Sequence, residues 1–599
     1  MKNNILFKVF CLSFLTATLS GCNSDFLNTA PATEFSETAV WGDPALVETY
    51  INNLYDRIDE PLTDGRMKAM IVDEAHYRGN TSSTNFNNGL ITQDNIPAWS
   101  GVSDYFTWDE LYKSIRYCNK FFDNVDKISF PITPVDGKTL QDRMMGEVHF
   151  LRATFYFNLT RIYGGVPIIK NVYGLNDDFS IARNSYADCI SFIISDLDKA
   201  IELLPLQHTG NNLGRATKGA AMAMKSRVLL YAASDLYNKQ VYDNYANQEL
   251  IRYTDNNQKN RWRAAKDAAK AVIDLGIYSL YKPNPTSSSE ASDNYYNLFI
   301  SKDCVEDIFV KYFTVNVGQR YGLYTSPNGY RGWGANAPIG NFVDDYEMSD
   351  GTAFDWNNPE HAASPYANRE PRFYATIFYN GAPWRPRYDE AKGLDPENRI
   401  QTGRKEVWNS KTSSVELHYG VDTRTSPIEN WNGSETGYYT KKYLDPNIDA
   451  VFVRQAVTWR FIRYGEILLN YAEACIELGE EEEARTFINM IRKRAGLPPI
   501  TETGEALKER YRHERRIELG MEDHRFFDVR RWLIGERAYK PALKADIIYK
   551  LNDDKTTSKT PTIRHKVFEN RKWENKMYFM PIMRSELNKN DKLIQNPEY

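Results

Sequence analysis

The sequence predicts a mostly α-helical protein, in which helical segments form a scaffold that is interrupted by long irregular loops with short strands. Two observations favour this fold class. Apolar residues recur at three- and four-residue spacing in several segments, and Gly, Pro, Asn and Tyr accumulate between about residues 280 and 458. The 39 Tyr, 29 Phe and 12 Trp argue against disorder in that loop-rich part.

The N-terminal residues predict export and lipidation. Two lysines precede a short apolar run, which leads through small residues to Leu19-Ser20-Gly21-Cys22. The run is shorter than the ~20 apolar residues of a membrane-spanning helix, and the pattern resembles a secretory signal that ends in a bacterial lipobox. We therefore expect residues 1–21 to be removed, Cys22 to carry a lipid anchor, and residues 22–40 to hold that anchor and a polar linker.

Several later segments have a helical pattern. The first has an apolar face made by Val148, Leu151, Phe155, Leu159 and Ile162, and it is predicted to end at Gly164-Gly165. Further helices are predicted at residues 186–204, 215–237 and 261–275. A last helical group starts at Trp459, and its small residues resemble degenerate tetratricopeptide repeats, which have one helix pair per unit.

The chain over residues 41–599 divides into segments by periodicity and composition. Its helical scaffold covers about 41–280 and 459–540, a loop-rich insertion covers about 281–458, and a C-terminal segment covers 541–599. Residues 76–108 form a smaller loop-rich stretch between helices. Loops of more than ~12–15 residues are usually functional or disordered, so the ligand is expected to contact these stretches.

Ordered motifs along the chain carry a resemblance to one family. They are EVHFLRA at 147–153 with YGGVP at 163–167, RATKGAA at 215–221, RYGEILLNYAEA at 463–474, RRIEL at 515–519, RFFDVRRW at 525–532 and QNPEY at 595–599. On these motifs, residues 22–599 resemble the SusD/RagB-like nutrient-binding outer-membrane lipoproteins of Bacteroidetes. That family more often has Gly before the terminal Tyr, where this chain has Glu598.

The resemblance implies a single mostly helical domain over residues 41–599, in which long loops with short strands form the ligand face. It also implies a lipid-anchored protein that faces the cell exterior and has no catalytic role or cofactor. It implies that the protein binds an oligosaccharide or polysaccharide and delivers it to a SusC-like TonB-dependent transporter. A peptide or another non-glycan nutrient in the same role is the alternative. The net charge of −5, which becomes more negative without the predicted signal, argues against a nucleic acid partner.

Candidate ligand-binding residues lie in the two loop-rich stretches, where aromatic rings could pack on sugar faces and polar side chains could bond hydroxyl groups. The resemblance points to these regions, and the residues are chosen from their local composition. They are Trp99, Trp333, Tyr330, Tyr324, Tyr77, Arg78, Asn80 and Arg331, with Asn328 as a further polar neighbour. Trp108 has helical spacing to Tyr112 and Arg116 and is expected in the core.

The sequence offers no catalytic constellation. Asp73-Glu74-Ala75-His76 spells a helicase box, but no phosphate-binding loop accompanies it, and HExxH and GxSxG are absent. The acids Glu514, Glu518, Asp523 and Asp528 alternate with arginines at helical spacing, so we expect ion pairs rather than a glycosidase pair.

Histidine and cysteine spacing predicts no metal site. The eight His are scattered, and no two of them stand four residues apart. Outside the signal and the anchor, the cysteines are far apart and lack zinc spacing, so buried thiols are expected, with one disulfide as the alternative.

Overall fold

The computed structural model describes residues 37–77, 81–96, 107–131, 134, 137–174 and 176–599. Of the described residues, 44% are in helices and 10% in strands, which confirms the predicted mostly helical class with short strands. Among the described residues, no helix is both long and apolar enough to span a membrane.

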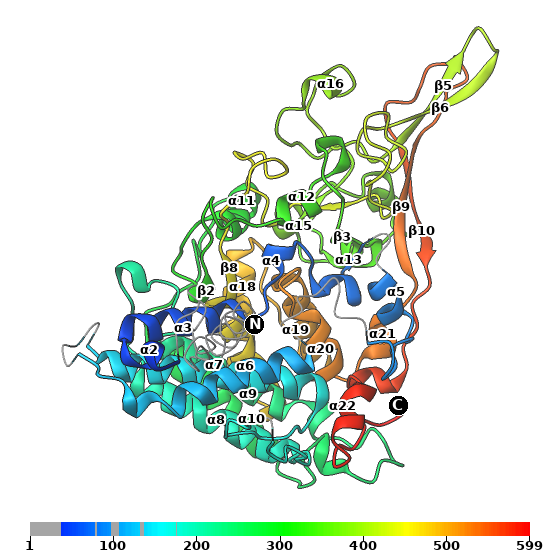
Figure 1. Cartoon of the computed structure of the whole chain (residues 1–599). Helices are drawn as coiled ribbons and strands as arrows, with labels where there is room; N and C mark the ends of the chain where they lie inside the picture. The colour runs from blue at the N-terminus through cyan, green and yellow to red at the C-terminus, as the bar shows by residue number, and fades with distance from the viewer. Residues whose placement is uncertain (1–36, 78–80, 97–106, 132–133, 135–136, 175) are drawn as a thin grey trace, which may run out of the picture.

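The scaffold is a series of helices in which each packs against the next (Figure 1). Its first members are α6 (Trp108–Phe122), α7 (Leu140–Tyr163), α8 (Tyr186–Leu203), α9 (Lys218–Ala233) and α10 (Gln258–Ile273). The series continues from α10 to α17 (Tyr464–Leu478), α18 (Glu481–Arg494) and α19 (Gly504–Glu518), although about 190 residues separate α10 from α17. The two predicted parts of the scaffold therefore form one continuous layer.

The predicted helices agree with the observed ones to within a few residues, except that the first is longer and one ends early. α7 ends where Gly164 takes a φ of +79°, and a Cβ there would lie 2.5 Å from the Leu250 carbonyl oxygen. The helix expected at residues 215–237 stops at Ala233 as α9, and a 3₁₀ turn over Asp235–Tyr237 follows it. Trp108 is 4% exposed, which confirms that it belongs to the core.

The N-terminal and C-terminal elements flank the scaffold. Before it stand α2 (Glu37–Gly42), α3 (Pro44–Asp56), α4 (Pro61–Asp64), β1 (Ala75–His76) and α5 (Thr81–Asn87). After it come α20 (Arg525–Arg531), α21 (Gly535–Ala538), β9 (Ala542–Tyr549), β10 (Thr562–Glu569) and α22 (Arg584–Lys589).

The loop-rich insertion has short elements of its own. Its helices are α11 (Ser288–Ile300), α12 (Tyr321–Thr325), α13 (Gly340–Asp345), α14 (Pro359–Ala363), α15 (Pro371–Thr376) and α16 (Asp389–Lys392). Its strands are β2 (Asp307–Lys311), β3 (Ala337–Pro338), β4 (Ile377–Phe378), β5 (Arg404–Asn409), β6 (Ser414–Tyr419) and β7 (Tyr439–Thr440). A second hydrophobic core, which includes Phe373, Tyr438 and Tyr443, holds this part together.

The largest sheet has the strand order β10-β9-β5-β6. Neighbouring strands are antiparallel except β5 and β9, which pair in parallel at Arg404↔Ile548 and Lys405↔Tyr549. Figure 1 shows that the β5–β6 hairpin projects away from the rest of the molecule.

One element boundary in the scaffold was predicted wrongly. The last helical group was expected to start at Trp459, but Trp459–Arg463 is strand β8, which pairs with β2, and α17 starts only at Tyr464. The stacked rings of Phe309 and Phe461, with centroids 4.9 Å apart, contribute to this pairing. The partner strand is about 150 residues away in sequence, so local periodicity could not reveal it.

The acids of α19 and α20 form ion pairs, as the sequence predicted. Glu514 accepts hydrogen bonds from Arg372 at 2.6 Å and from Arg492 at 2.9 Å. Burial alone would raise the pKa of Glu514, but these two guanidinium groups lower it to about 2. Glu514 therefore cannot serve as a protonated acid at neutral pH.

The partners of these acids differ from the expected neighbours in sequence. Glu518 pairs with Arg372, Arg463 and Arg494, and Asp523 pairs with Lys68. Of the four acids singled out in the sequence, Asp528 alone takes a partner at helical spacing, Arg531, in addition to Arg515.

The cysteines of the described residues are free thiols. Cys118, Cys189 and Cys475 are buried, and Cys304 is half-buried. Burial raises the pKa of Cys189 to about 12, so its thiolate is not populated at neutral pH. The expectation of buried thiols is confirmed for these three residues.

Candidate ligand-binding site

A short antiparallel strand pair joins the two predicted loop-rich stretches. β1 pairs with β3 through Ala75↔Pro338 and His76↔Ala337. Because the strands run in opposite directions, Tyr77, directly after β1, lies at the same end as the segment directly before β3. Residues 77 and 321–336 are therefore neighbours in space, although more than 240 residues separate them in sequence.

Three of the predicted ligand residues form an aromatic cluster, defined here as Tyr77, Tyr324 and Trp333. The Tyr324 ring packs edge-to-face on both others, with centroids 4.7 Å from Trp333 and 6.5 Å from Tyr77. The Arg66 guanidinium lies 5.4 Å from the Tyr324 ring centre. Tyr324 is buried, Tyr77 is half-buried and Trp333 is 38% exposed, so Trp333 presents its ring to solvent on a supported base.

Backbone hydrogen bonds fix the position of Trp333. Its N–H donates to the Leu323 carbonyl at 2.9 Å, and the Ala335 N–H donates to the Tyr324 carbonyl at 2.7 Å. The chain therefore folds back so that residues 333–335 lie along α12. Between them Gly334 has a φ of +59°, a conformation that favours glycine.

A second loop packs against this one and carries Trp431, which is 72% exposed. The side-chain amide of Asn328 donates to the carbonyls of Thr423 at 2.8 Å and Glu429 at 2.6 Å, which ties the two loops together. A Cβ on Gly334 would lie 2.8 Å from the Asn432 carbonyl oxygen. Trp333 and Trp431 are thus carried by two loops in direct contact.

Trp431 was missed in the sequence-based choice of ligand residues. It lies in Glu429-Asn430-Trp431-Asn432-Gly433, a polar stretch with the same turn-forming composition that drew attention to Trp333. A search for tryptophans inside Asn- and Gly-rich segments would have found it.

Three residues proposed to contact ligand are buried instead: Tyr324, which supports Trp333, and two residues that hold the loops together. Tyr330 is 0% exposed, its hydroxyl donates to the Arg385 carbonyl at 2.7 Å, and its ring lies 4.1 Å from the Arg387 guanidinium. Asn328 is also 0% exposed, and its amide bonds the second loop. Both predictions are wrong for this conformation, because each side chain holds the loops together and is closed to a ligand.

Arg331 is exposed beside a separate aromatic pair. Its side chain is ion-paired with Glu390, and its guanidinium lies 5.8 Å from the Tyr388 ring centre. Tyr388 in turn packs edge-to-face against Phe452, which is 64% exposed. Arg331 therefore remains accessible, but its contacts are with Glu390 and Tyr388 rather than with the aromatic cluster.

Four further predicted residues cannot be placed relative to the cluster. Trp99, Arg78, Asn80 and the predicted anchor Cys22 lie outside the described residues.

Charged groups stand next to the aromatic cluster. His76, which precedes Tyr77, lies 3.4 Å from Glu435 and 3.1 Å from Glu569, and Arg424 lies 3.9 Å from Glu435. Burial alone would lower the pKa of His76, but the two carboxylates raise it above its ordinary value. The surroundings offer donors and acceptors that could orient a polar ligand on the rings.

Comparisons with known proteins agree on one family. The model of the SusD family matches residues 308–599, and a SusD-like model described as starch-binding and associating with the outer membrane matches residues 25–230. A SusD-like protein of Formosa agariphila is 22% identical over 564 residues, which cover 87% of this chain and 91% of that protein.

Solved structures of similar proteins share the fold. A SusD-like protein from Bacteroides fragilis has a TM-score of 0.72 and 28% identity, and the match covers 95% of this chain and 100% of that one. A laminarin-binding SusD-like protein has a TM-score of 0.60 and 18% identity over 93% of this chain and 100% of its own. The resemblance drawn from the sequence motifs is confirmed: the chain belongs to the SusD family of carbohydrate-binding proteins, which associate with the outer membrane and are not enzymes.

Proposed function

We propose that this chain is a lipid-anchored protein of the outer cell surface that binds a glycan and delivers it to a SusC-like TonB-dependent transporter. The observation that carries the glycan-binding part is Trp333, which is 38% exposed on a base of buried Tyr324 and half-buried Tyr77. Flat aromatic faces suit the C–H faces of sugar rings, and loops on a rigid frame are where binding residues concentrate. The N-terminal pattern and family membership support the proposed anchor, outward orientation and transporter partner.

The neighbouring loop extends this surface. Trp431 would provide a second ring, and Arg424, Glu435 and His76 would bond hydroxyl groups and set the orientation of the glycan. An open surface leaves much of the ligand in water, so we expect a Kd between about 1 mM and 1 μM, or roughly 4–8 kcal/mol. Two structural neighbours, described as laminarin-binding and as a surface glycan-binding protein, support a glycan ligand through a shared fold.

Removing either exposed tryptophan should weaken glycan binding. We expect Trp333→Ala and Trp431→Ala each to raise the Kd about 5- to 30-fold, since a ring at the centre of a binding surface contributes ~1–2 kcal/mol. Calorimetric titration with soluble laminari- and malto-oligosaccharides, followed by longer chains of whichever binds, measures the effect. Trp408→Ala on the projecting β5–β6 hairpin is the control and should leave binding unchanged.

Two results would argue against this site. If Trp333→Ala and Trp431→Ala lower the melting temperature and leave the Kd unchanged, then the rings serve packing and the glycan binds elsewhere. If oligosaccharides fail to bind and a peptide pool binds with a Kd that depends on Trp333, then the nutrient is a peptide.

Lipid anchoring has its own test. Cys22→Ala should release the protein from the membrane fraction, because the pattern Leu19-Ser20-Gly21-Cys22 predicts that this thiol is the acyl acceptor. Fractionation of cells that lack the cognate transporter measures the change, with Cys304→Ala as a matched cysteine control. Retention of the Cys22→Ala protein in the membranes of such cells would disprove the anchor.

A further inference from the structure

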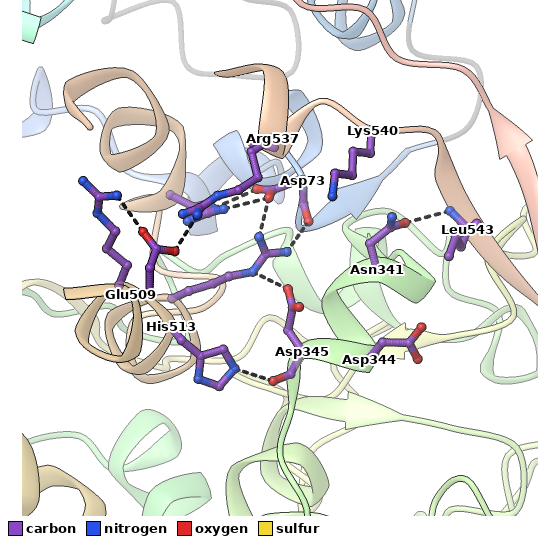
Figure 2. A pocket seen from close by; sticks show the side chains of 13 residues that line it. Asp73, Asn341, Asp344, Asp345, Glu509, His513, Arg537, Lys540 and Leu543 are labelled. Atoms are coloured by element: carbon purple, nitrogen blue, oxygen red, sulfur yellow. Dashed lines mark hydrogen bonds and ion pairs between the residues drawn. The ribbon is translucent and has the colours of Figure 1, made fainter. Parts of the chain in front are cut away.

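A second concave site lies apart from the aromatic cluster. It is a pocket of about 440 Å³ between α13, α19 and the segment around α21, and it shares no lining residue with the cluster. We call it the basic pocket, and its charged lining includes Asp73, Arg512, Arg516, Arg525, Arg537 and Lys540. Figure 2 shows the pocket surrounded by Glu509 of α19, Arg537 of α21, Lys540, and Asp73 of the segment before β1.

The inner wall of the basic pocket is electrically balanced. Asp73 accepts hydrogen bonds from Arg525 at 2.9 Å and from Arg516, and the Arg516 Nε lies 2.8 Å from the Asp345 carboxylate. Burial alone would raise the pKa of Asp73, but Arg516 and Arg525 hold it well below its usual range. Asp73 and Asp345 thus balance Arg516 and Arg525, and this wall adds no net charge.

The outer wall has more cations than acids. Arg512 and Arg537 both pair with one carboxylate, that of Glu509. Lys540 is exposed, and its ammonium group has no ion-pair or hydrogen-bond partner among the residues that the structure describes. Three cations therefore share one acid, and the side chain of Arg537 is 48% exposed and accessible from solvent.

The remaining acid of the lining is engaged elsewhere. Asp344 accepts a hydrogen bond from the Trp356 indole N–H at 3.0 Å and lies 3.0 Å from His565 Nδ1. Figure 2 shows its carboxylate pointing away from the cluster of arginines. Among the described residues it forms no ion pair with Arg537 or Lys540, and the lining as a whole carries five cationic side chains against four acids.

We propose that the basic pocket binds an anionic group of the glycan, a carboxylate or a sulfate ester, between Arg537, Lys540 and Arg512. Guanidinium groups donate paired hydrogen bonds to such oxygens, and a lysine adds a point charge. The volume falls within the range of about 300–1,000 Å³ that is typical of small-molecule sites. Since the whole chain has a net charge of −5, the attraction is local to this pocket.

The chain connects the basic pocket to the aromatic cluster. Asp73 is only four residues from Tyr77, so their Cα atoms are at most ~14 Å apart. A single glycan could therefore contact both sites, with its neutral rings on the cluster and a charged substituent in the pocket. The inference rests on the proposed function for the identity of the ligand, and it specifies acidic glycans as the preferred class.

The test uses three probes of similar shape: glucose, glucuronate and glucose 6-sulfate. Wild-type protein should bind glucuronate, glucose 6-sulfate or both about tenfold more tightly than glucose, and added salt should reduce the difference. The double variant Arg537→Gln/Lys540→Gln should lose this preference without a change in the weak binding of glucose. Ligand-observed NMR titration measures the three dissociation constants.

A matched control separates the pocket from general charge effects. Arg399→Gln/Lys559→Gln also removes an exposed, ion-paired arginine and an exposed lysine, and neither residue lines the basic pocket. This control variant should keep the preference for the anionic probes over glucose. Melting temperatures of all variants check the fold, and the glucuronate and glucose 6-sulfate arms show which anionic group the pocket takes.

The proposal is overturned if wild-type protein binds the three probes equally. It is also overturned if the preference survives in Arg537→Gln/Lys540→Gln or falls equally in the control. Failure of the aromatic site is distinguishable: if Trp333→Ala leaves oligosaccharide binding intact while the pocket variant loses its preference, the basic pocket stands and the proposed cluster does not.

Discussion

Replacing Glu518 with Gln should lower the free energy of unfolding by about 3–5 kcal/mol at neutral pH. The Glu518 side chain is fully buried, and its carboxylate accepts hydrogen bonds from Arg463 at 2.7 Å, from Arg372 at 3.1 Å and from Arg494. Gln keeps the shape of the side chain but removes the charge. Three buried guanidinium groups would then lose one carboxylate partner. Buried cations that are not compensated by an anion destabilise the folded state.

The effect should be large because this carboxylate joins separate parts of the chain. Arg372 belongs to α15 of the insertion, Arg463 ends β8, and Arg494 ends α18 of the scaffold. The other acids around them are already engaged, since Glu306 pairs with Arg463 and Arg494. The network therefore has no spare carboxylate to replace Glu518.

Urea unfolding followed by fluorescence and circular dichroism measures the change. A chain of 599 residues need not unfold in one step, so both signals must move together before a free energy is assigned. Glu505→Gln, on the exposed side of the same helix, is the matched control and should change stability by less than ~0.5 kcal/mol. Equal small shifts in both variants would show that the buried network tolerates the loss of charge.

Local sequence patterns predicted the helical scaffold well. Helix periodicity and a terminating glycine depend on residues within a few positions of each other, and α7, α8 and α10 follow them closely. Most of the family motifs lie on or at the ends of helices, namely α7, α9, α17, α19 and α20. The fold class and the family could therefore be predicted from the sequence.

The candidate site could be predicted only in part, because exposure depends on partners that are distant in sequence. Tyr330 and Trp333 have the same loop composition, yet Arg387 covers Tyr330 while Tyr324 supports Trp333 from below. The partners of the buried ion pairs could not be predicted for the same reason, since Arg372 is 142 residues from Glu514 in the sequence. The composition of its segment could have marked Trp431 as a candidate, but that segment alone does not show that Asn328 ties its loop to the loop of Trp333.

The segment Asp73-Glu74, which resembles part of a helicase box, has a structural explanation that the sequence did not suggest. Asp73 takes the hydrogen bonds of Arg516 and Arg525, whereas Glu74, 1% exposed, receives only a 3.4 Å contact from the Met521 N–H. Its second carboxylate oxygen has no hydrogen-bond partner among the described residues. Adjacent carboxyl groups thus have opposite environments.

The free energy of unfolding of Glu74→Gln, relative to that of wild type, should increase as the pH rises from 4.5 to 8. Burial raises the pKa of Glu74 to about 8, and the negative charge of Asp73 adds to this increase. The positive charges of Arg516 and Arg525 lower the pKa, but they oppose the increase only in part. The folded state therefore keeps a proton that the unfolded chain, with a pKa near 4.5, releases. The contribution of Glu74 to stability is fully present below pH 4.5 and is lost as the pH rises towards 8.

The variant carries no titratable group at position 74, so its advantage over wild type should grow by about 3 kcal/mol between pH 4.5 and pH 7, at 1.36 kcal/mol per pKa unit. Asp73 stays ionised throughout this range and does not contribute to the slope. Urea midpoints of wild type, Glu74→Gln and the exposed control Glu505→Gln at pH 4.5, 6, 7 and 8 test this. A difference between Glu74→Gln and wild type that is independent of pH would mean that Glu74 is ionised in the folded protein, held by Arg516 and Arg525.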